Sequence, residues 1–118
     1  MKIEPIQIGK IEECDVYVIG LESICICVRN LKKAKDVLME FLPFSIEIEN
    51  SKEFGWVIKI TGNLEKIFNS LRKLEEKGIF ERKKGIDYFR LLSDIREILA
   101  KEVVKRVGGG ENEGNVYA

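Results

Sequence analysis

The chain has 118 residues, 45% of them hydrophobic and 34% charged, so it is long enough to bury a core of its own. Twenty basic side chains balance twenty acidic ones, and this zero net charge gives no global field that would draw the chain to nucleic acid or to an anionic membrane. The lack of histidine excludes Ser-His-Asp and Cys-His catalytic pairs and any imidazole metal site.

The composition also bears on the compartment. No apolar run approaches the roughly 20 residues of a membrane span, and the polar start is unlike a signal peptide. We therefore expect no membrane association, and we expect the three cysteines to be thiols in a reducing cytoplasm. Abundant lysine and glutamate, with a single glutamine and a single threonine, are typical of thermophile proteins.

The first part of the chain predicts strands. Residues 2–8 alternate imperfectly and include Pro5, which cannot donate to a ladder, so we expect an edge strand that Gly9 ends. Residues 15–19 are β-branched and aromatic, which favours a second strand. Residues 24–28 are apolar at every position, which predicts a central strand covered on both faces.

The middle of the chain alternates helix and strands. Asn30 is placed to cap a helix over residues 31–42, and Pro43 stops it. Residues 44–49 and 56–61 each alternate apolar with polar side chains. This pattern predicts the two strands of a hairpin with one face in water.

The last part predicts two more helices around a short strand. Asn63 can cap a helix that carries an apolar stripe and ends before Gly78. Residues 79–82 are short and rich in charge, as suits an exposed edge strand. Asp87 can cap a long final helix whose last turns hold basic residues that complement the helix dipole.

The order strand, helix, strand, strand, helix, strand over residues 24–82 is that of the split β-α-β unit of ferredoxin-like folds. We predict an α+β, ferredoxin-like β-α-β-β-α-β sandwich with extra N-terminal strands and a long C-terminal helix. Residues 1–107 form one domain and residues 108–118 a flexible Gly/Glu/Asn tail. Because two helices cover only one sheet face, the strand at 24–28 needs further cover from the last helix, a second copy or another subunit.

Three cysteines are candidate metal or redox residues. Cys25 and Cys27 are two apart on one predicted strand and share a face, and Cys14 is placed on a neighbouring strand. A thiolate site usually needs four ligands, and the spacing differs from the C-x-x-C redox turn. Small buried thiols that fill strand positions are the favoured interpretation, so we predict neither a metal nor a cofactor.

Six basic residues are candidates for a nucleic-acid site: Arg82, Lys83, Lys84, Lys101, Lys105 and Arg106. A ferredoxin-like sheet is the scaffold of RNA-recognition domains, but their aromatic-rich strand motif is missing here. A solvated turn and helix end is the favoured interpretation. Two acidic residues, Glu47 and Glu49, share a strand face with Lys59 opposite, which predicts cross-strand ion pairs rather than an acid–base pair.

Two segments invite comparison with known families. The run VRNLKKAKDVLMEFLPF resembles the opening module of the vicinal-oxygen-chelate superfamily, whose metal-binding histidine would fall near Ser23. That module continues with three strands, whereas a helix is predicted from Leu64. The element order is similar to ACT-type amino-acid-sensing domains, which implies a ligand near Arg29 and Asn30, where those domains usually carry glycine. Neither resemblance assigns the chain to a family.

The sequence leaves the activity open. We predict a non-catalytic binding, regulatory or assembly module that acts through self-association or a partner subunit. No catalytic residue is predicted, and a small-molecule ligand at a dimer seam has no identified residues. The alternatives are a cysteine-based metal or redox protein and an RNA-binding module.

Overall fold

The computed structural model describes residues 2–108. Its elements follow in the order β1 (Lys2–Ile11), β2 (Cys14–Gly20), β3 (Ser23–Val28), α1 (Leu31–Glu40), β4 (Ser45–Ser51), β5 (Gly55–Thr61), α2 (Leu64–Glu76), β6 (Phe80–Arg82) and α3 (Tyr88–Gly108). The fold is α+β, which confirms the predicted class. Gly108 closes α3 instead of opening the predicted tail, and residues 109–118 lie outside the described residues.

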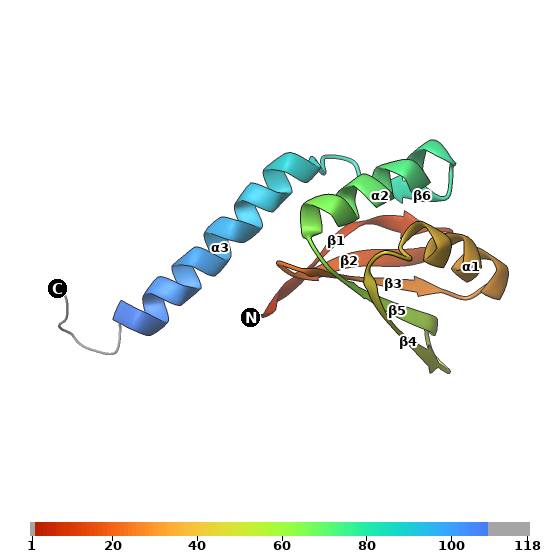
Figure 1. Ribbon diagram of the computed structural model, residues 1–118, viewed down its shortest axis with the longest axis horizontal. Helices are drawn as coiled ribbons and strands as arrows, with labels where there is room; N and C mark the ends of the chain where they lie inside the picture. The colour runs from red at the N-terminus through yellow and green to blue at the C-terminus, as the bar shows by residue number, and fades with distance from the viewer. Residues whose placement is uncertain (1, 109–118) are drawn as a thin grey trace.

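All six strands form one antiparallel sheet in the order β4-β5-β3-β2-β1-β6. The apolar strand β3 lies between β5 and β2, so its predicted central place is confirmed. Helices α1 and α2 lie over the same face of the sheet (Figure 1). The core fills the space between them, where Ile24, Ile26 and Val28 of β3 are fully buried.

Local signals set the helix ends. The side-chain oxygens of Asn30, Asn63 and Asp87 each accept a hydrogen bond from a backbone N–H of the following first turn, at 2.8 to 3.2 Å. These contacts satisfy donors that a helix start leaves unpaired, and they confirm the three predicted caps. Gly78 follows α2 with φ of +74°, a conformation that glycine adopts without steric cost.

The prediction that the N-terminal strand ends at Gly9 is wrong. Strand β1 continues to Ile11, and its last three residues pair with β6, whereas the residues before Gly9 pair with β2 alone. Pro5 falls within an irregularity of the β1–β2 register, which accommodates its missing N–H. A Cβ at Gly9 would overlap the Phe80 ring and the Glu81 carbonyl, so glycine here allows β6 to approach rather than ending the strand.

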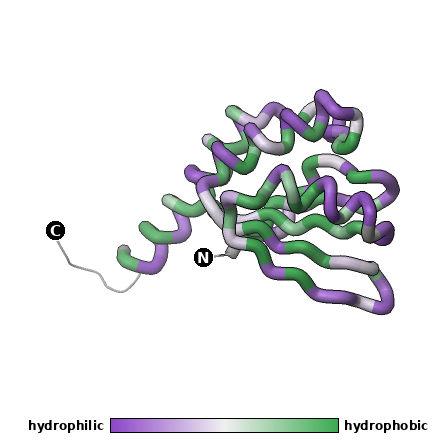
Figure 2. Tube along the Cα trace, turned by 45° about the vertical axis from the view of Figure 1, so that its right-hand side comes forward, coloured by the Kyte–Doolittle hydropathy of each residue, from purple (hydrophilic) through white to green (hydrophobic). Residues whose placement is uncertain are grey.

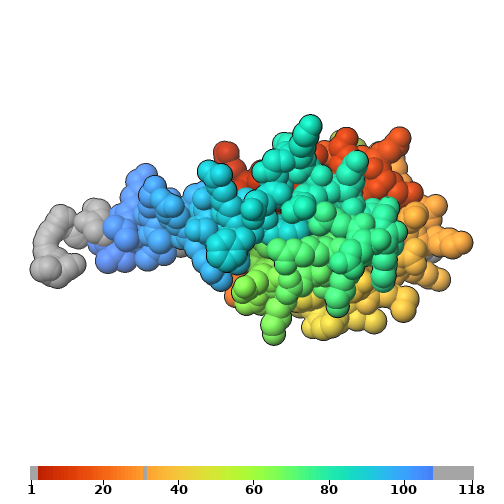
Figure 3. Space-filling model, turned by 90° about the horizontal axis from the view of Figure 1, so that it is seen from above, coloured from red at the N-terminus to blue at the C-terminus, as the bar shows by residue number. Residues whose placement is uncertain are grey.

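Helix α3 starts beside α2 and then runs past the ends of the strands (Figures 1 and 3). The radius of gyration is 16.8 Å, compared with about 13 Å for a compact chain of this size. Its first half is packed through Leu92, Ile95 and Leu99, which are 6%, 0% and 8% exposed. The turns beyond Leu99 project from the body. No helix in the described part of the chain is long and apolar enough to cross a membrane.

Tyr88 anchors the start of α3. Its side chain is 2% exposed and stacks on Phe68 at 4.8 Å between ring centroids. The Tyr88 hydroxyl donates to Glu75 Oε2 at 2.8 Å, and Arg82 Nε lies 3.3 Å from Glu75 Oε1. The guanidinium groups of Arg72 and Arg82 lie 5.2 and 4.9 Å from the Tyr88 ring centre. Burial, followed by the Glu75 carboxylate, raises the pKa of Tyr88, so the phenol stays protonated and ties α3 to α2 and β6.

Candidate functional site

The sheet face opposite α1 and α2, which we call the open face, is crossed by rows of side chains in register. Two rows cross its middle: Tyr17, Cys25, Lys59 and Glu47 in the first, and Cys27, Val57 and Glu49 in the second. In Figure 1 the helices α1 and α2 lie on the other side of the sheet, and α3 departs past the strand ends. The open face is therefore the surface that the described part of the chain leaves without a helix layer.

The centre of the open face is apolar and partly shielded. The residues that form it are half-buried: Tyr17, Ile19, Cys25, Cys27 and Val57. Next to them in sequence, Ile24 and Ile26 point to the other face and are 0% exposed. The predicted need for cover on both faces of β3 is thus met on one face only. An apolar centre with a charged border is the usual anatomy of a protein–protein interface.

One aromatic side chain of this centre is held in place by its neighbours. The Tyr17 hydroxyl donates to Asp15 Oδ2 at 3.2 Å, and Gln7 Nε2 donates to Asp15 Oδ1 at 2.9 Å. The hydrogen bond to Asp15 and its negative charge raise the pKa of Tyr17. The Tyr17 ring is therefore held in one orientation on the open face.

The border along β4 is acidic and unpaired. Glu47 lies opposite Lys59 in the β4–β5 register, yet neither Glu47 nor Glu49 forms an ion pair within residues 2–108. The prediction of cross-strand ion pairs is therefore wrong. The described ion pairs are Lys77–Glu40, Arg82–Glu75 and Lys101–Glu97. The two β4 carboxylates are thus charged groups at the border of the open face that no cation of the described residues neutralises by an ion pair.

The structure places the three candidate cysteines on two neighbouring strands, with the Cys14 thiol next to Cys27. Cys25 and Cys27 share the open face of β3, Cys14 begins β2, and all three are free thiols. The Cys27 thiol donates to the Phe54 carbonyl. Among residues 2–108, no group of three or more His, Cys, Asp or Glu side chains is arranged to hold a metal ion.

The thiols on β3 are also poorly suited to nucleophilic chemistry. Burial raises the pKa of Cys25. Burial, with a smaller contribution from the neighbouring Cys14 thiol, raises the pKa of Cys27 to about 11. A reactive cysteine needs the opposite shift, because the thiolate is the nucleophile. These thiols are best described as small apolar side chains of the open face.

Thiol labelling checks this assignment. At pH 8 we expect Cys27 in the folded protein to react roughly 100-fold more slowly with an alkylating reagent than in the chain unfolded by urea, because its pKa of about 11 leaves little thiolate. The folded rate should rise with pH toward 11. Mass spectrometry of the labelled Cys27 peptide gives the rate. A folded rate equal to or above the unfolded rate would contradict the raised pKa and revive a reactive thiol.

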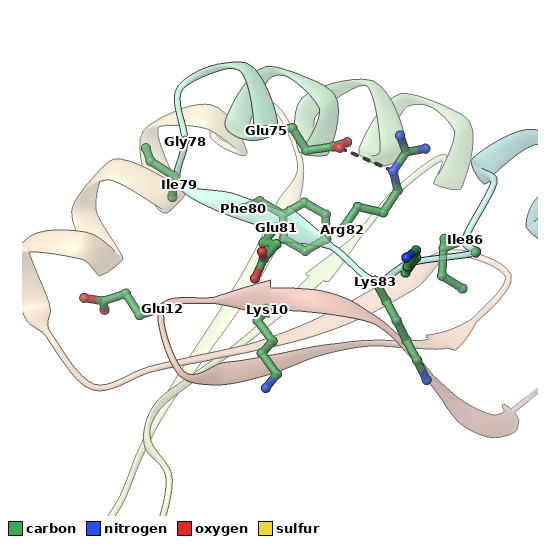
Figure 4. A pocket seen from close by; sticks show the side chains of 12 residues that line it. Lys10, Glu12, Glu75, Gly78, Ile79, Phe80, Glu81, Arg82, Lys83 and Ile86 are labelled. Carbon is green, nitrogen blue, oxygen red and sulfur yellow. Dashed lines mark ion pairs between the residues drawn. The ribbon is translucent and has the colours of Figure 1, made fainter.

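The six basic candidates are divided between the two ends of α3. Arg82, Lys83 and Lys84 lie at or just after β6, whereas Lys101, Lys105 and Arg106 lie in the projecting turns, beginning about 20 Å along the helix from its start. Figure 4 shows Arg82 turned toward Glu75. The surface around β6 encloses a shallow cavity of about 740 Å³ whose lining holds both signs of charge: Lys10, Glu12, Glu81, Lys83 and Lys84. The structure does not bring the basic residues into one surface.

A groove of about 970 Å³ joins the open face to α3. Its lining includes Ile19, Ser23, Lys59 and Thr61 from the sheet together with Leu99 and Val103 from the helix. The sequence could not locate this groove, because its position depends on the direction in which α3 leaves the body. The groove places the projecting part of α3 at the margin of the open face.

The projecting turns carry apolar side chains in water, which we call the valine stripe: Val103, Val104 and Val107, at 46%, 68% and 69% exposure. With about 100° per residue, Lys101 and Arg106 lie about 110° to either side of the stripe. In Figure 2 hydrophobic and hydrophilic turns alternate along this end of the helix. The sequence places Val103 on an apolar helix face, but only the structure shows that this face extends beyond its own sheet.

Compared with protein-family models, with curated proteins and with solved structures, the chain matches none of them.

Proposed function

We propose that this chain is a non-catalytic assembly module that associates with a second copy of itself through the open face. The observation that carries the proposal is the half-buried apolar centre of that face, bordered by the unpaired carboxylates of Glu47 and Glu49. Complete burial of one side chain such as Val57 contributes about 1.5–3 kcal/mol. Covering several of them together is a sufficient driving force for association.

The face is a better route to association than either edge of the sheet. At the β4 edge, antiparallel pairing of two copies centred on Ile48 would bring Glu47 of one copy opposite Glu49 of the other, and like charges in that position are destabilising. At the other edge, β6 has only three residues, Phe80–Arg82. Both edges are thus protected against pairing with a strand of another copy. The open face has no comparable protection against contact with another copy.

The same geometry supports a ferredoxin-like fold whose sheet contains two additional strands. The elements β3, α1, β4, β5, α2 and β6 have the order of the split β-α-β unit, and the hairpin β1–β2 stands between its first and last strands. We include this assignment in the proposal. The inserted hairpin widens the open face, because β1 and β2 add Gln7 and Tyr17 to it.

The alternatives are less well supported. The raised pKa values of Cys25 and Cys27 disfavour a redox or nucleophilic role, and the separation of the basic residues disfavours an RNA-binding surface. The free thiols agree with a cytoplasmic location.

Sedimentation equilibrium tests the proposal directly. The subunit mass is 13.6 kDa, and the protein is expected to sediment as a dimer of twice that mass. Val57→Lys places a charge in the centre of the open face and should raise the dimer dissociation constant at least about 10-fold, since removing a buried apolar contact costs more than 1.4 kcal/mol. Asp36→Asn, which makes the same change in net charge on the exposed side of α1, should leave it unchanged. A wild-type protein that stays monomeric at every concentration would overturn the proposal.

A further inference from the structure

We infer that the open face of each copy is covered by the valine stripe of the other copy, so that two chains exchange the ends of their α3 helices. This inference rests on the proposed self-association and names the segment that makes the contact. The inference requires a sheet surface that can bind a helix end and an apolar helix end that is exposed to water. The described part of the chain has both.

Only Val103 of the valine stripe lines a groove beside its own sheet, and Val104 and Val107 are 68% and 69% exposed. Tyr88 fixes the start of α3, Leu99 is still buried, and the valine stripe beyond it is exposed. No glycine or proline lies between Tyr88 and Val107, so the sequence offers no position for the sharp bend that would return these turns to their own sheet. Apolar surface in this position is best removed from water by another molecule.

The receiving surface matches the helix end in size and chemistry. Residues 99–107 span about 12 Å at 1.5 Å per residue, and the three strand spacings from β2 to β4 span about 14 Å. The helix end can therefore lie across the rows of Tyr17, Cys25, Cys27 and Val57, which are half-buried and apolar.

The charges at the two surfaces are opposite and available. Arg106, on one flank of the valine stripe, forms no ion pair within residues 2–108, and the same is true of Glu47 and Glu49. An α3 end that reaches β4 of the partner brings the two groups together at the border of the contact. Ion pairs at such a border add little free energy but select the orientation of the helix.

The exchange is self-consistent under two-fold symmetry. Each copy donates one helix end and receives one, so both contacts are the same and the assembly closes as a dimer. The groove lined by Leu99, Val103 and Ile19 marks the point where the donated helix leaves its own body beside its own open face. The helix end that a copy donates and the helix end that it receives thus lie next to each other, on the same side of that copy.

Charge exchange between the two surfaces tests the inference in the full chain. Glu49→Lys should raise the dimer dissociation constant about fivefold, and Arg106→Glu should do the same, because each places like charges together. Both substitutions in one chain should return the constant to within about twofold of wild type, because opposite charges then face each other again. Lys32→Glu on α1 reverses one charge away from both surfaces and should change nothing.

A second variant tests the apolar contact. Val104→Ser with Val107→Ser changes side chains that are 68% and 69% exposed in the single chain. At a concentration where both proteins are monomers its urea midpoint should stay close to wild type, whereas the dimer should be lost at concentrations where the wild type dimerises. If the wild type dimerises and Val57→Lys dissociates it, but the valine and charge variants keep wild-type dissociation constants, the helix exchange is wrong and the open-face proposal survives. If the wild type is a monomer, both are wrong.

Discussion

Replacing Tyr88 with alanine is expected to lower the free energy of unfolding by about 3–5 kcal/mol, the range for removing a buried aromatic ring. The ring is 2% exposed and stacks on Phe68, so its loss leaves a cavity between α2 and α3. The Glu75 carboxylate loses its hydroxyl partner, and Arg72 and Arg82 lose the ring face that they flank. Urea unfolding followed by the fluorescence of the single tryptophan gives the change.

Tyr88→Phe is the matched control. It keeps the ring and removes only the hydroxyl that donates to Glu75 at 2.8 Å, so the expected loss is about 1 kcal/mol. Amide hydrogen exchange should show early opening of α3 in the alanine variant and not in the phenylalanine variant. Equal losses for the two variants would mean that the hydrogen bond, and not the stacked ring, anchors the helix.

What the sequence predicts well is set by neighbours along the chain. Asn30, Asn63 and Asp87 each cap the helix that follows because the hydrogen bond is made within three residues. The apolar run at residues 24–28 correctly identifies the central strand, although cover on its second face, which the same run predicts, is not found within residues 2–108. These features needed no knowledge of the tertiary structure.

What the sequence does not predict is set by contacts between distant segments. The sequence predicts that Gly9 ends a strand. In the structure Gly9 instead leaves space for Phe80 and Glu81, about 70 residues later in the chain, to pack against β1. Glu47 and Lys59 are correctly placed as neighbours, but register alone does not make an ion pair. The apolar residues of α3 keep helical spacing along the whole helix. That spacing does not show which of them pack on the body of the protein and which project beyond it.

The candidate site shows the same division. The sharing of one face by Cys25 and Cys27 follows from their spacing of two residues on a strand. That this face lacks a helix layer follows from the path of α3, which depends on the Tyr88 anchor. The valines beyond Leu99 could be recognised as functional only after that path was known.

Two isoleucines in one row of the sheet give the other large expected effect. Ile58 of β5 and Ile48 of β4 are direct partners in the register and point to the same face, but Ile58 is 0% exposed and Ile48 is 50% exposed. Ile58→Ala removes side-chain atoms beneath the helices and should cost about 2–5 kcal/mol, because the close-packed core cannot fully collapse around the cavity.

Ile48→Ala makes the same chemical change one strand away and should cost about 1 kcal/mol or less, because half of that side chain is already in water. Urea midpoints of the two variants, measured at the same protein concentration, are directly comparable, because both side chains lie on the helix-covered face and away from the proposed contact. Equal losses would mean that α1 covers the β4 edge as fully as it covers the centre. The helix layer would then extend over β4, and the acidic border of the open face would belong to a fully packed strand rather than to the margin of the sheet.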